Sequence, residues 1–326
     1  MSKVISGFLS DIAKEKNGYS IGDPWRYSEF SLSAIVPLIR KTDEDRKYRL
    51  PSEVGAQLKI KDTGEINKMH VLNKSEFPVL MKAGQILVGA TQSRALTSST
   101  VIFPGEELDV DCCCVYSNKG IRMDQEVKFR EYSPKTVRHA LYQGHAHLAR
   151  GMSGPTYSAH VQNDVWGSVK SYAKDMASSA DEFGASINFM TEQTDLAGRV
   201  AESKERFDKV LKDIPLEKNQ VGCVLISVEG LEAIESFDHT DSWKALRESI
   251  LGADSAKVSG MSRDNVFEYK AEKAKSLITK TLSLDFDETV TVDKPSTKTV
   301  FLKSDKINGE VVLLHGEPIC LSLIGK

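Results

Sequence analysis

The chain contains, between residues 56 and 71, the stretch AQLKIKDTGEINKMHV, and this stretch indicates the fold class of the first half. Its two apolar runs, 56–60 and 66–71, flank the polar turn Lys61–Gly64, which is typical of a β-hairpin. Further short apolar runs separated by turn residues occupy 31–38, 79–81, 85–88, 98–103 and 107–116. Strands at this spacing predict an antiparallel β-sandwich or an open barrel.

The pattern becomes helical after residue 134. Apolar residues recur every three or four positions over 165–176 and again over 196–211, which predicts two amphipathic helices. Between Pro134 and the first of these stretches, the Gly-rich segment 144–156 predicts a mobile loop.

The last third of the chain predicts an α/β unit. Residues 221–228 form a compact apolar run that indicates a buried strand, and amphipathic helices follow. The chain then closes with three antiparallel strands. Asn308-Gly309 is the expected hairpin turn between the first two, and His315–Pro318 links the last two. The predicted fold class is therefore α+β: an antiparallel β-sandwich or open barrel in the N-terminal part, a helical middle segment, and a C-terminal α/β unit ending in antiparallel strands.

These patterns divide the chain into four parts. They are an N-terminal amphipathic helix with its linker at 1–26, a β-rich domain at 27–133, a helical segment at 134–220 and a C-terminal α+β unit at 221–326. A second interpretation remains open, in which the C-terminal strands complete the N-terminal sheet within a single α+β fold.

Composition and charge narrow the classes of partner. The chain has 326 residues, of which 40% are hydrophobic, and a formal net charge of −3. No basic stripe favours nucleic acid, and no run approaches the roughly 20 apolar residues that cross a bilayer. The apolar residues at 4, 5, 8, 9 and 12 are spaced for an amphipathic helix rather than a secretory signal. We expect a cytoplasmic protein whose N-terminal helix caps a core or meets a second subunit.

The five cysteines do not indicate a disulfide framework. Their number is odd, and Cys112, Cys113 and Cys114 are adjacent, so a reducing compartment fits them best. In a strand, Cys112 and Cys114 would face one side and Cys113 the other. Buried free cysteines pack as small apolar residues, and we expect that role for these three.

Recognised catalytic and cofactor motifs are missing from the sequence. It contains no phosphate-binding loop, no dinucleotide fingerprint, no Cys-x-x-Cys pair and no His-Glu-x-x-His. His139, His145 and His147 lie close together but have no further ligand nearby, so we expect exposed loop histidines and no metal site. The sequence identifies no cofactor.

The best candidate ligand site lies where one strand pair leads into the next. Gln85, Gln92 and Arg94 gather there, and an arginine can hold a phosphate or carboxylate through two hydrogen bonds. The alternative is that Arg94 pairs with an acidic residue of the same sheet. Trp166, at the start of the first amphipathic helix, is a further candidate, although an aromatic residue there also suits an anchor on the sheet.

Several segments together resemble a prokaryotic family, the ARG-and-rhodanese-phosphatase-associated protein domain. The most specific is VLMKAGQILVGATQSR at 79–94, supported by VDCCCV at 110–115, by Gln162 with Trp166, and by VGCVLI at 221–226. The chain departs from the family pattern at Gln85, where a glutamate is expected. The family is named for its association with ADP-ribosylglycohydrolase and rhodanese-phosphatase proteins, so the resemblance implies a link to ADP-ribose or related metabolites.

Three hypotheses for the function follow. The first is a ligand-binding protein for a nucleotide-derived metabolite such as ADP-ribose, held near Gln85, Gln92, Arg94 and Trp166. The second is a homo-oligomeric structural or assembly protein without catalysis. The third is a hydrolase acting on an ADP-ribose-like substrate through acidic residues and a histidine from distant segments.

Overall fold

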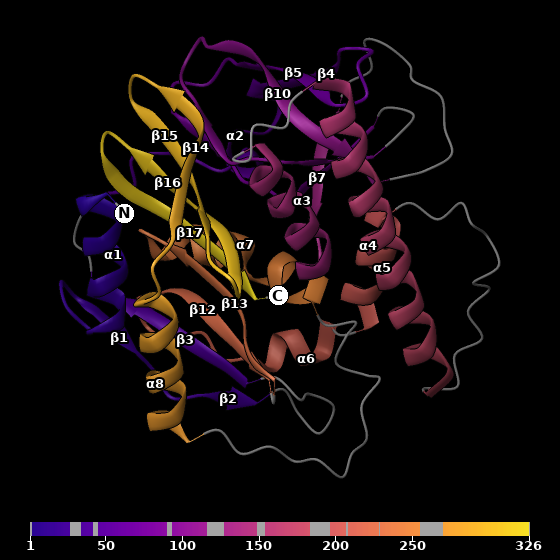
Figure 1. The fold of residues 1–326 in the computed structure, drawn as a ribbon. Helices are drawn as coiled ribbons and strands as arrows, with labels where there is room; N and C mark the ends of the chain where they lie inside the picture. The colour runs from indigo at the N-terminus through magenta and orange to yellow at the C-terminus, as the bar shows by residue number, and fades with distance from the viewer. Residues whose placement is uncertain are drawn as a thin grey trace. The chain divides into compact units, whose positions relative to one another are not determined.

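The computed structural model describes residues 2–26, 34–41, 45–89, 93–115, 127–148, 154–182, 196–206, 208–227, 229–254 and 270–325. They form the α+β fold expected from the sequence (Figure 1). The chain divides into two compact units. The sheet unit comprises Met1–Arg46, Phe207–Leu251 and Val258–Lys326, and the barrel unit comprises Lys47–Arg206 and Gly252–Lys257. Both units draw on separate stretches of chain, so these boundaries differ from the consecutive ones expected from the pattern.

The sheet unit is built on a nine-stranded antiparallel sheet. Its strands lie in the order β1, β3, β12, β13, β17, β16, β15, β14, and β2 also pairs with β3. The bounds are β1 Tyr19–Ile21, β2 Trp25–Arg26, β3 Ala34–Arg40, β12 Gln220–Ser227, β13 Gly230–Phe237, β14 Asp287–Lys294, β15 Thr297–Lys303, β16 Ile307–Leu314 and β17 Glu317–Gly325. Because β3 pairs with β12, strands from before residue 41 and after residue 219 share one sheet.

Helices α1 (Lys3–Ala13) and α8 (Ala271–Leu282) pack together on one face of this sheet (Figure 1). The apolar spacing of α1 places Ile5 and Leu9 in the same buried cluster as Ile278 of α8 and Val224 of β12. The Ser2 hydroxyl accepts the Ile5 N–H at 3.3 Å and caps the helix. The N-terminal helix therefore covers the core of its own chain, which is one of the two roles expected for it.

Two other helices of the sheet unit are next to its central strands in the sequence. They are α6 (Asp208–Asp213), which precedes β12, and α7 (Thr240–Asp254), which follows β13 and belongs to this unit up to Leu251. Trp243 of α7 is buried and anchors the helix, as apolar spacing along residues 243–251 predicts.

The barrel unit contains a six-stranded antiparallel sheet in the order β11, β7, β8, β10, β5, β4. Val127, just before β11, donates its backbone N–H to the Ile60 carbonyl of β4 at 3.1 Å, so the two outer strands meet and the barrel is nearly closed. The bounds of its strands are β4 Leu58–Asp62, β5 Lys68–Asn73, β7 Gln85–Val88, β8 Arg94–Leu96, β10 Glu107–Cys114 and β11 Lys128–Tyr132. A separate pair consists of β6 (Val79–Met81) and β9 (Thr100–Ile102). The short helix α2 (Pro51–Val54) precedes β4. The expected hairpin of β4 and β5 is confirmed.

The barrel strand β10 separates two apolar clusters. Cys112 packs with Leu87, Leu96 and Met69 in one cluster, whereas Cys113 packs in the other against the helices. This confirms the predicted alternation and the role of these residues in core packing. Burial raises the pKa of the Cys113 thiol to about 12, so it stays protonated.

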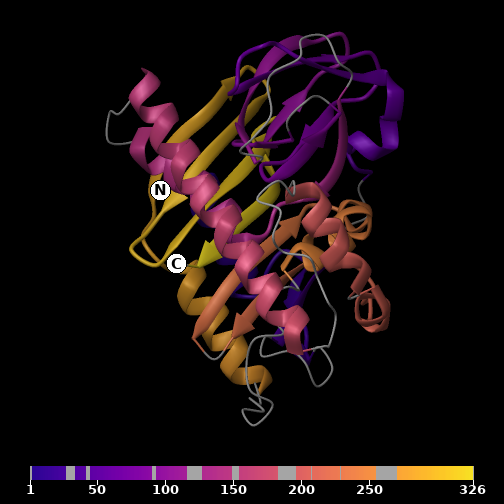
Figure 2. The ribbon, with the colours of Figure 1, turned by 90° about the vertical axis from the view of Figure 1, so that its right-hand side faces the viewer.

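The helical layer of the barrel unit consists of α3 (Lys135–Leu148), α4 (Gly154–Glu182) and α5 (Leu196–Arg206). Figure 2 shows α4 as one long continuous helix. The loop expected at 144–156 is wrong at both ends, because α3 continues through Gly144 to Leu148 and α4 begins at Gly154. Residues 149–153 lie outside the described part. In the part of the chain that the structure describes, no helix is long and apolar enough to cross a membrane.

The hairpin turn predicted at Asn308-Gly309 is also wrong, because both residues lie within β16. The turn is formed instead at Ser304–Lys306, where the Ser304 N–H donates to the Ile307 carbonyl at 2.8 Å. A Cβ on Gly309 would lie 2.7 Å from Cα of Leu323 on β17 and would also collide with the Ser322 carbonyl oxygen. The glycine is therefore required for the close approach of two strands, and not for a turn.

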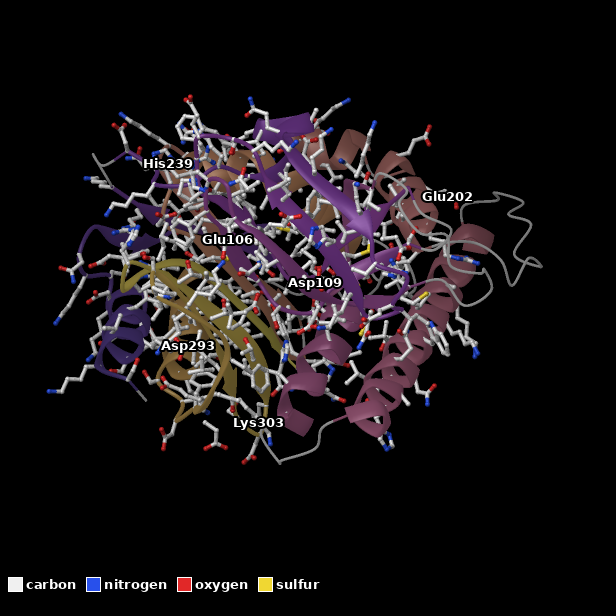
Figure 3. All side chains as sticks on the ribbon, turned by 90° about the horizontal axis from the view of Figure 1, so that it is seen from above. Glu106, Asp109, Glu202, His239, Asp293 and Lys303 are labelled. Carbon is white, nitrogen blue, oxygen red and sulfur yellow. The ribbon has the colours of Figure 1, made fainter. Side chains whose placement is uncertain are left out.

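On the barrel's outer face, His70 of β5 lies between two carboxylates of β10. Its Nδ1 is 2.8 Å from Asp109 Oδ1 and its Nε2 is 2.7 Å from Glu107 Oε1 (Asp109 is labelled in Figure 3). Hydrogen bonds to Asp109 and then to Glu107 raise the pKa of His70. The imidazolium therefore joins two neighbouring strands.

Truncation of the α1 anchor should destabilise the protein. Leu9 is fully buried, so Leu9→Ala should lower the free energy of unfolding by about 2–5 kcal/mol. Val4→Ala on the same helix is the matched control, because Val4 is 47% exposed, and its effect should stay within about 0.5 kcal/mol. Urea denaturation measures both. Equal effects of the two substitutions would show that α1 is not docked.

The His70 cluster should make stability depend on pH. Because its pKa is raised on folding, the contribution is fully present below the unfolded value of about 6.5 and is lost as the pH rises through the folded pKa. These side chains are partly exposed, so His70→Gln should cost only about 0.5–1 kcal/mol at pH 6 and almost nothing at pH 9. His160→Gln, on exposed α4 surface, is the control. A cost of His70→Gln that is the same at both pH values would contradict the assignment.

Candidate functional site

Arg94, the strongest candidate from the sequence, lies inside the barrel. It begins β8, and its Nη1 is 2.9 Å from Asp62 Oδ2 of β4, with both side chains fully buried. Asp62 also accepts the Gly64 N–H through Oδ1 at 2.9 Å, which orders the β4–β5 turn. The structure therefore realises the alternative left open by the sequence, in which Arg94 pairs with an acidic residue of its own sheet.

The surroundings of Arg94 are crowded and apolar. Its Nη1 also lies 2.7 Å from Met69 Sδ, and Leu87 stands opposite it on β7. Its Nε and Nη2 have no hydrogen-bond partner among the described residues. Asp62 neutralises the charge of the guanidinium, so there is no electrostatic demand for a second anion here.

Of the other predicted site residues, the structure describes two, and they lie on two different elements. Gln85 begins β7, beside β8, and its Oε1 accepts the Lys82 N–H at 2.8 Å, which closes the turn between β6 and β7. Trp166 is half-buried on α4. Gln92 lies outside the described residues. The structure thus brings Gln85 and Arg94 into neighbouring strands, but each binds an internal partner.

His145 forms a contact that the sequence did not predict. It is buried on α3, contrary to the expected exposed loop, and its Nε2 lies 3.1 Å from Ser98 Oγ and 2.8 Å from the Thr97 carbonyl oxygen. A carbonyl can only accept, so Nε2 must carry the proton. It then cannot act as a base toward Ser98, and burial lowers the pKa of His145 as well. The pair therefore does not form an activated nucleophile.

Two of the three histidines that lie close together in the sequence, His139 and His145, have described side chains. Within the described ranges, no three His, Cys, Asp or Glu side chains are grouped so that they could hold a metal ion. The side chain of His147 is not among those described.

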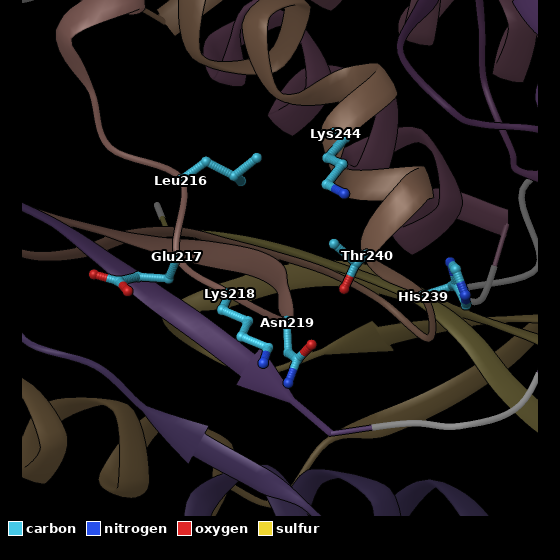
Figure 4. Close-up of a pocket in the computed structure, with 7 residues that line it drawn as sticks. All are labelled: Leu216, Glu217, Lys218, Asn219, His239, Thr240 and Lys244. Carbon is cyan, nitrogen blue, oxygen red and sulfur yellow. The ribbon is translucent and has the colours of Figure 1, made fainter.

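A surface pocket of about 380 Å³ lies in the sheet unit (Figure 4). Its position follows from the topology: β12 and β13 are antiparallel neighbours, so the turn entering β12 and the helix leaving β13 meet at one end of the sheet. The lining residues are Leu216, Glu217, Lys218, Asn219, His239, Thr240 and Lys244. Figure 4 shows Lys218 and Asn219 extending side by side, with Thr240 and Lys244 on the other wall and Glu217 turned away.

One wall is a well-ordered turn. The Gln220 N–H donates to the Glu217 carbonyl at 3.2 Å, and Asn219 has a left-handed φ of 62°, which asparagine tolerates better than most residues. The Asn219 carbonyl accepts the Arg40 N–H of β3 at 2.9 Å. These bonds fix the backbone from which Lys218 and Asn219 project.

The other wall is the first turn of α7. His239 precedes the helix, and its Nδ1 accepts the Asp241 N–H at 3.1 Å, as an N-cap residue does. Neutral His239 therefore carries its proton on Nε2 and remains a donor there. The His239 carbonyl also accepts the Ser242 N–H, so backbone groups of this turn are already engaged within the protein.

Charges around the pocket favour an anion. Lys218 and Lys244 are exposed cations of the lining, and Lys244 Nζ is only loosely paired with Asp241 at 3.8 Å. Two arginines lie close by on the same unit: Arg40 donates to the Asp238 carbonyl and Arg46 to the Ser242 hydroxyl. The sequence predicted amphipathic helices after the strand at 221–228 but not this pocket. The two walls lie about 20 residues apart in the sequence, and only the pairing of β12 with β13 brings them together.

The Arg94–Asp62 pair can be tested as a structural element. Asp62→Ala leaves the guanidinium buried without its partner and should lower the free energy of unfolding by about 3–5 kcal/mol. Replacing both residues together (Asp62→Leu with Arg94→Met) should recover most of that loss, since no buried charge then remains. Urea denaturation measures both, and Lys61→Ala at the exposed neighbouring position is the control. A double variant no more stable than Asp62→Ala would refute the pairing.

Comparison with known proteins supports the resemblance read from the sequence. The profile of the ARG and Rhodanese-Phosphatase-superfamily-associated Protein domain matches residues 18–324. No curated protein and no solved structure matches the chain. Since the matched residues span nearly the whole sequence, the chain belongs to the ARG and Rhodanese-Phosphatase-superfamily-associated Protein domain family.

Proposed function

We propose that the protein binds a small anionic metabolite in the pocket between the Glu217–Gln220 turn and the start of α7. The observation that carries this proposal is a pocket of about 380 Å³ in which Lys218 and Lys244 stand on opposite walls. That volume lies within the roughly 300–1,000 Å³ of small-molecule sites. A nucleotide-derived metabolite such as ADP-ribose fits the charge of the pocket and the association expressed in the family's description.

The pocket supports this function better than the site inferred from the sequence. Arg94 is fully buried and neutralised by Asp62, whereas the lysines of the pocket are in contact with solvent. A ligand can reach the lysines without any rearrangement of the barrel. The proposal therefore retains the class of ligand expected from the sequence and moves its location.

The structural alternative receives less support from α1. Its apolar face, with Ile5, Leu9 and Ile12, is buried against its own sheet, so that face is not available to a second subunit. For the hydrolase alternative, which needs acidic residues and a histidine, the carboxylate of Asp109 is already bound to His70. Ligand binding thus remains the function with the most direct physical basis.

A thermal-shift panel tests the proposal. We expect stabilisation by ADP-ribose or by mononucleotides, which at 100 times the dissociation constant amounts to about 2.7 kcal/mol. Lys218→Ala should weaken binding about tenfold, because one charge-assisted hydrogen bond is lost. Lys306→Ala, an exposed lysine of the β15–β16 turn, should leave it unchanged.

Two results would contradict the proposal. One is the absence of any shift across nucleotides, sugar phosphates and inorganic anions. The other is a ligand whose affinity is the same in Lys218→Ala as in Lys306→Ala, since binding would then occur away from this pocket. The Asp62→Leu/Arg94→Met variant provides a further check, because it removes Arg94 and should keep the ligand affinity.

A further inference from the structure

The donors of the pocket are spread over two walls. Lys218 and Asn219 project from the turn, and Lys244, Thr240 and His239 belong to the helix side. Each ammonium has three donors on a freely rotating group, and neutral His239 adds its Nε2–H. A ligand group at the centre would therefore meet N–H and O–H donors from several directions at once.

Arginine is not among the seven lining residues. This matters because the planar guanidinium is the side chain that matches a planar carboxylate through two parallel hydrogen bonds. Lysine acts instead as a compact point charge without a preferred plane. A tetrahedral oxyanion, whose oxygens point in different directions, makes better use of such donors than a flat carboxylate does.

The backbone of α7 contributes little to the site. His239 accepts the Asp241 N–H through its side chain and the Ser242 N–H through its carbonyl. These N–H groups are therefore not available to hold an anion at the helix start. We therefore expect recognition to come mainly from side chains, and above all from the two lysines.

Resting on the proposed function, we infer that the group this pocket recognises is a tetrahedral oxyanion, the phosphoryl group of the metabolite, and not a carboxylate. The phosphoryl oxygens lie between Lys218 and Lys244 and accept from His239 Nε2. The amide of Asn219, beside Lys218, is placed to bind a polar edge of the rest of the ligand. The exposed side chain of Leu216 offers an apolar contact at the rim.

Calorimetric titration with three phenyl compounds tests this inference. Phenyl sulfate and benzoate carry the same single charge on the same ring, so they differ in the shape of the anionic group, and phenyl phosphate adds a second charge. We expect the wild-type protein to bind phenyl phosphate most tightly. Phenyl sulfate should bind about tenfold more tightly than benzoate, because its third oxygen can accept one additional charge-assisted hydrogen bond. Lys218→Ala should weaken the two tetrahedral ligands, and Lys306→Ala should not.

A conservative variant separates charge from geometry. Lys218→Arg keeps the positive charge and introduces a planar fork, so it should reduce the preference for phenyl sulfate over benzoate. Benzoate binding as tight as phenyl sulfate in the wild type would overturn the inference and leave the anion pocket standing. Failure of all three probes, together with no shift in the nucleotide panel, would instead remove the proposed function and this inference with it.

Discussion

The pairing of β12 with β13 is the constraint on which the candidate site depends. It holds the turn before β12 and the helix after β13 at one end of the sheet, although their pocket residues are about 20 positions apart. The pairing itself requires Gly222, because a Cβ there would lie 2.7 Å from Cα of Ser236 and would collide with the Glu235 carbonyl oxygen. On its other side, β12 is held by β3, whose Arg40 N–H bonds to Asn219. The turn that forms one wall of the pocket is therefore held by backbone hydrogen bonds to the sheet.

Local patterns in the sequence were sufficient to predict most helices and strands, but not which strands pair with one another. The β4–β5 hairpin, the N-terminal helix and the alternation of Cys112 and Cys113 follow from short-range periodicity, which the sequence displays directly. Long-range pairing has no such signal: nothing local places β3 against β12. The Asn308-Gly309 prediction failed for the same reason, since the glycine is required by its contacts with Ser322 and Leu323 of β17, more than ten residues further along the chain.

The chemistry of the candidate site could not be predicted from the sequence for the same reason, because it depends on residues that lie far apart in the chain. The sequence left open whether Arg94 holds a ligand or pairs with an acidic residue of its own sheet. The structure pairs it with Asp62, 32 positions away and on a strand that is not its neighbour in the sheet. Only closure of the barrel brings the two together. Lys218 and Lys244, by contrast, stand in polar surroundings of ordinary composition, and two exposed lysines carry no signal until the fold places them on one pocket.

The positions of the arginine and lysine side chains follow from how strongly each cation is hydrated. The guanidinium is weakly hydrated and forms fixed, directional pairs, so Arg94 with Asp62 and Arg138 with Asp254 can be buried in the barrel unit at 2.9 and 2.7 Å. An ammonium is strongly hydrated and is costly to bury; Lys82, which is buried, lies over the ring of Tyr132 at 5.3 Å. The lysines of the pocket keep their water and can exchange it for a ligand's oxygens. Arginine thus stabilises the interior of the barrel unit, and the positive charge of the pocket lining is carried by lysine.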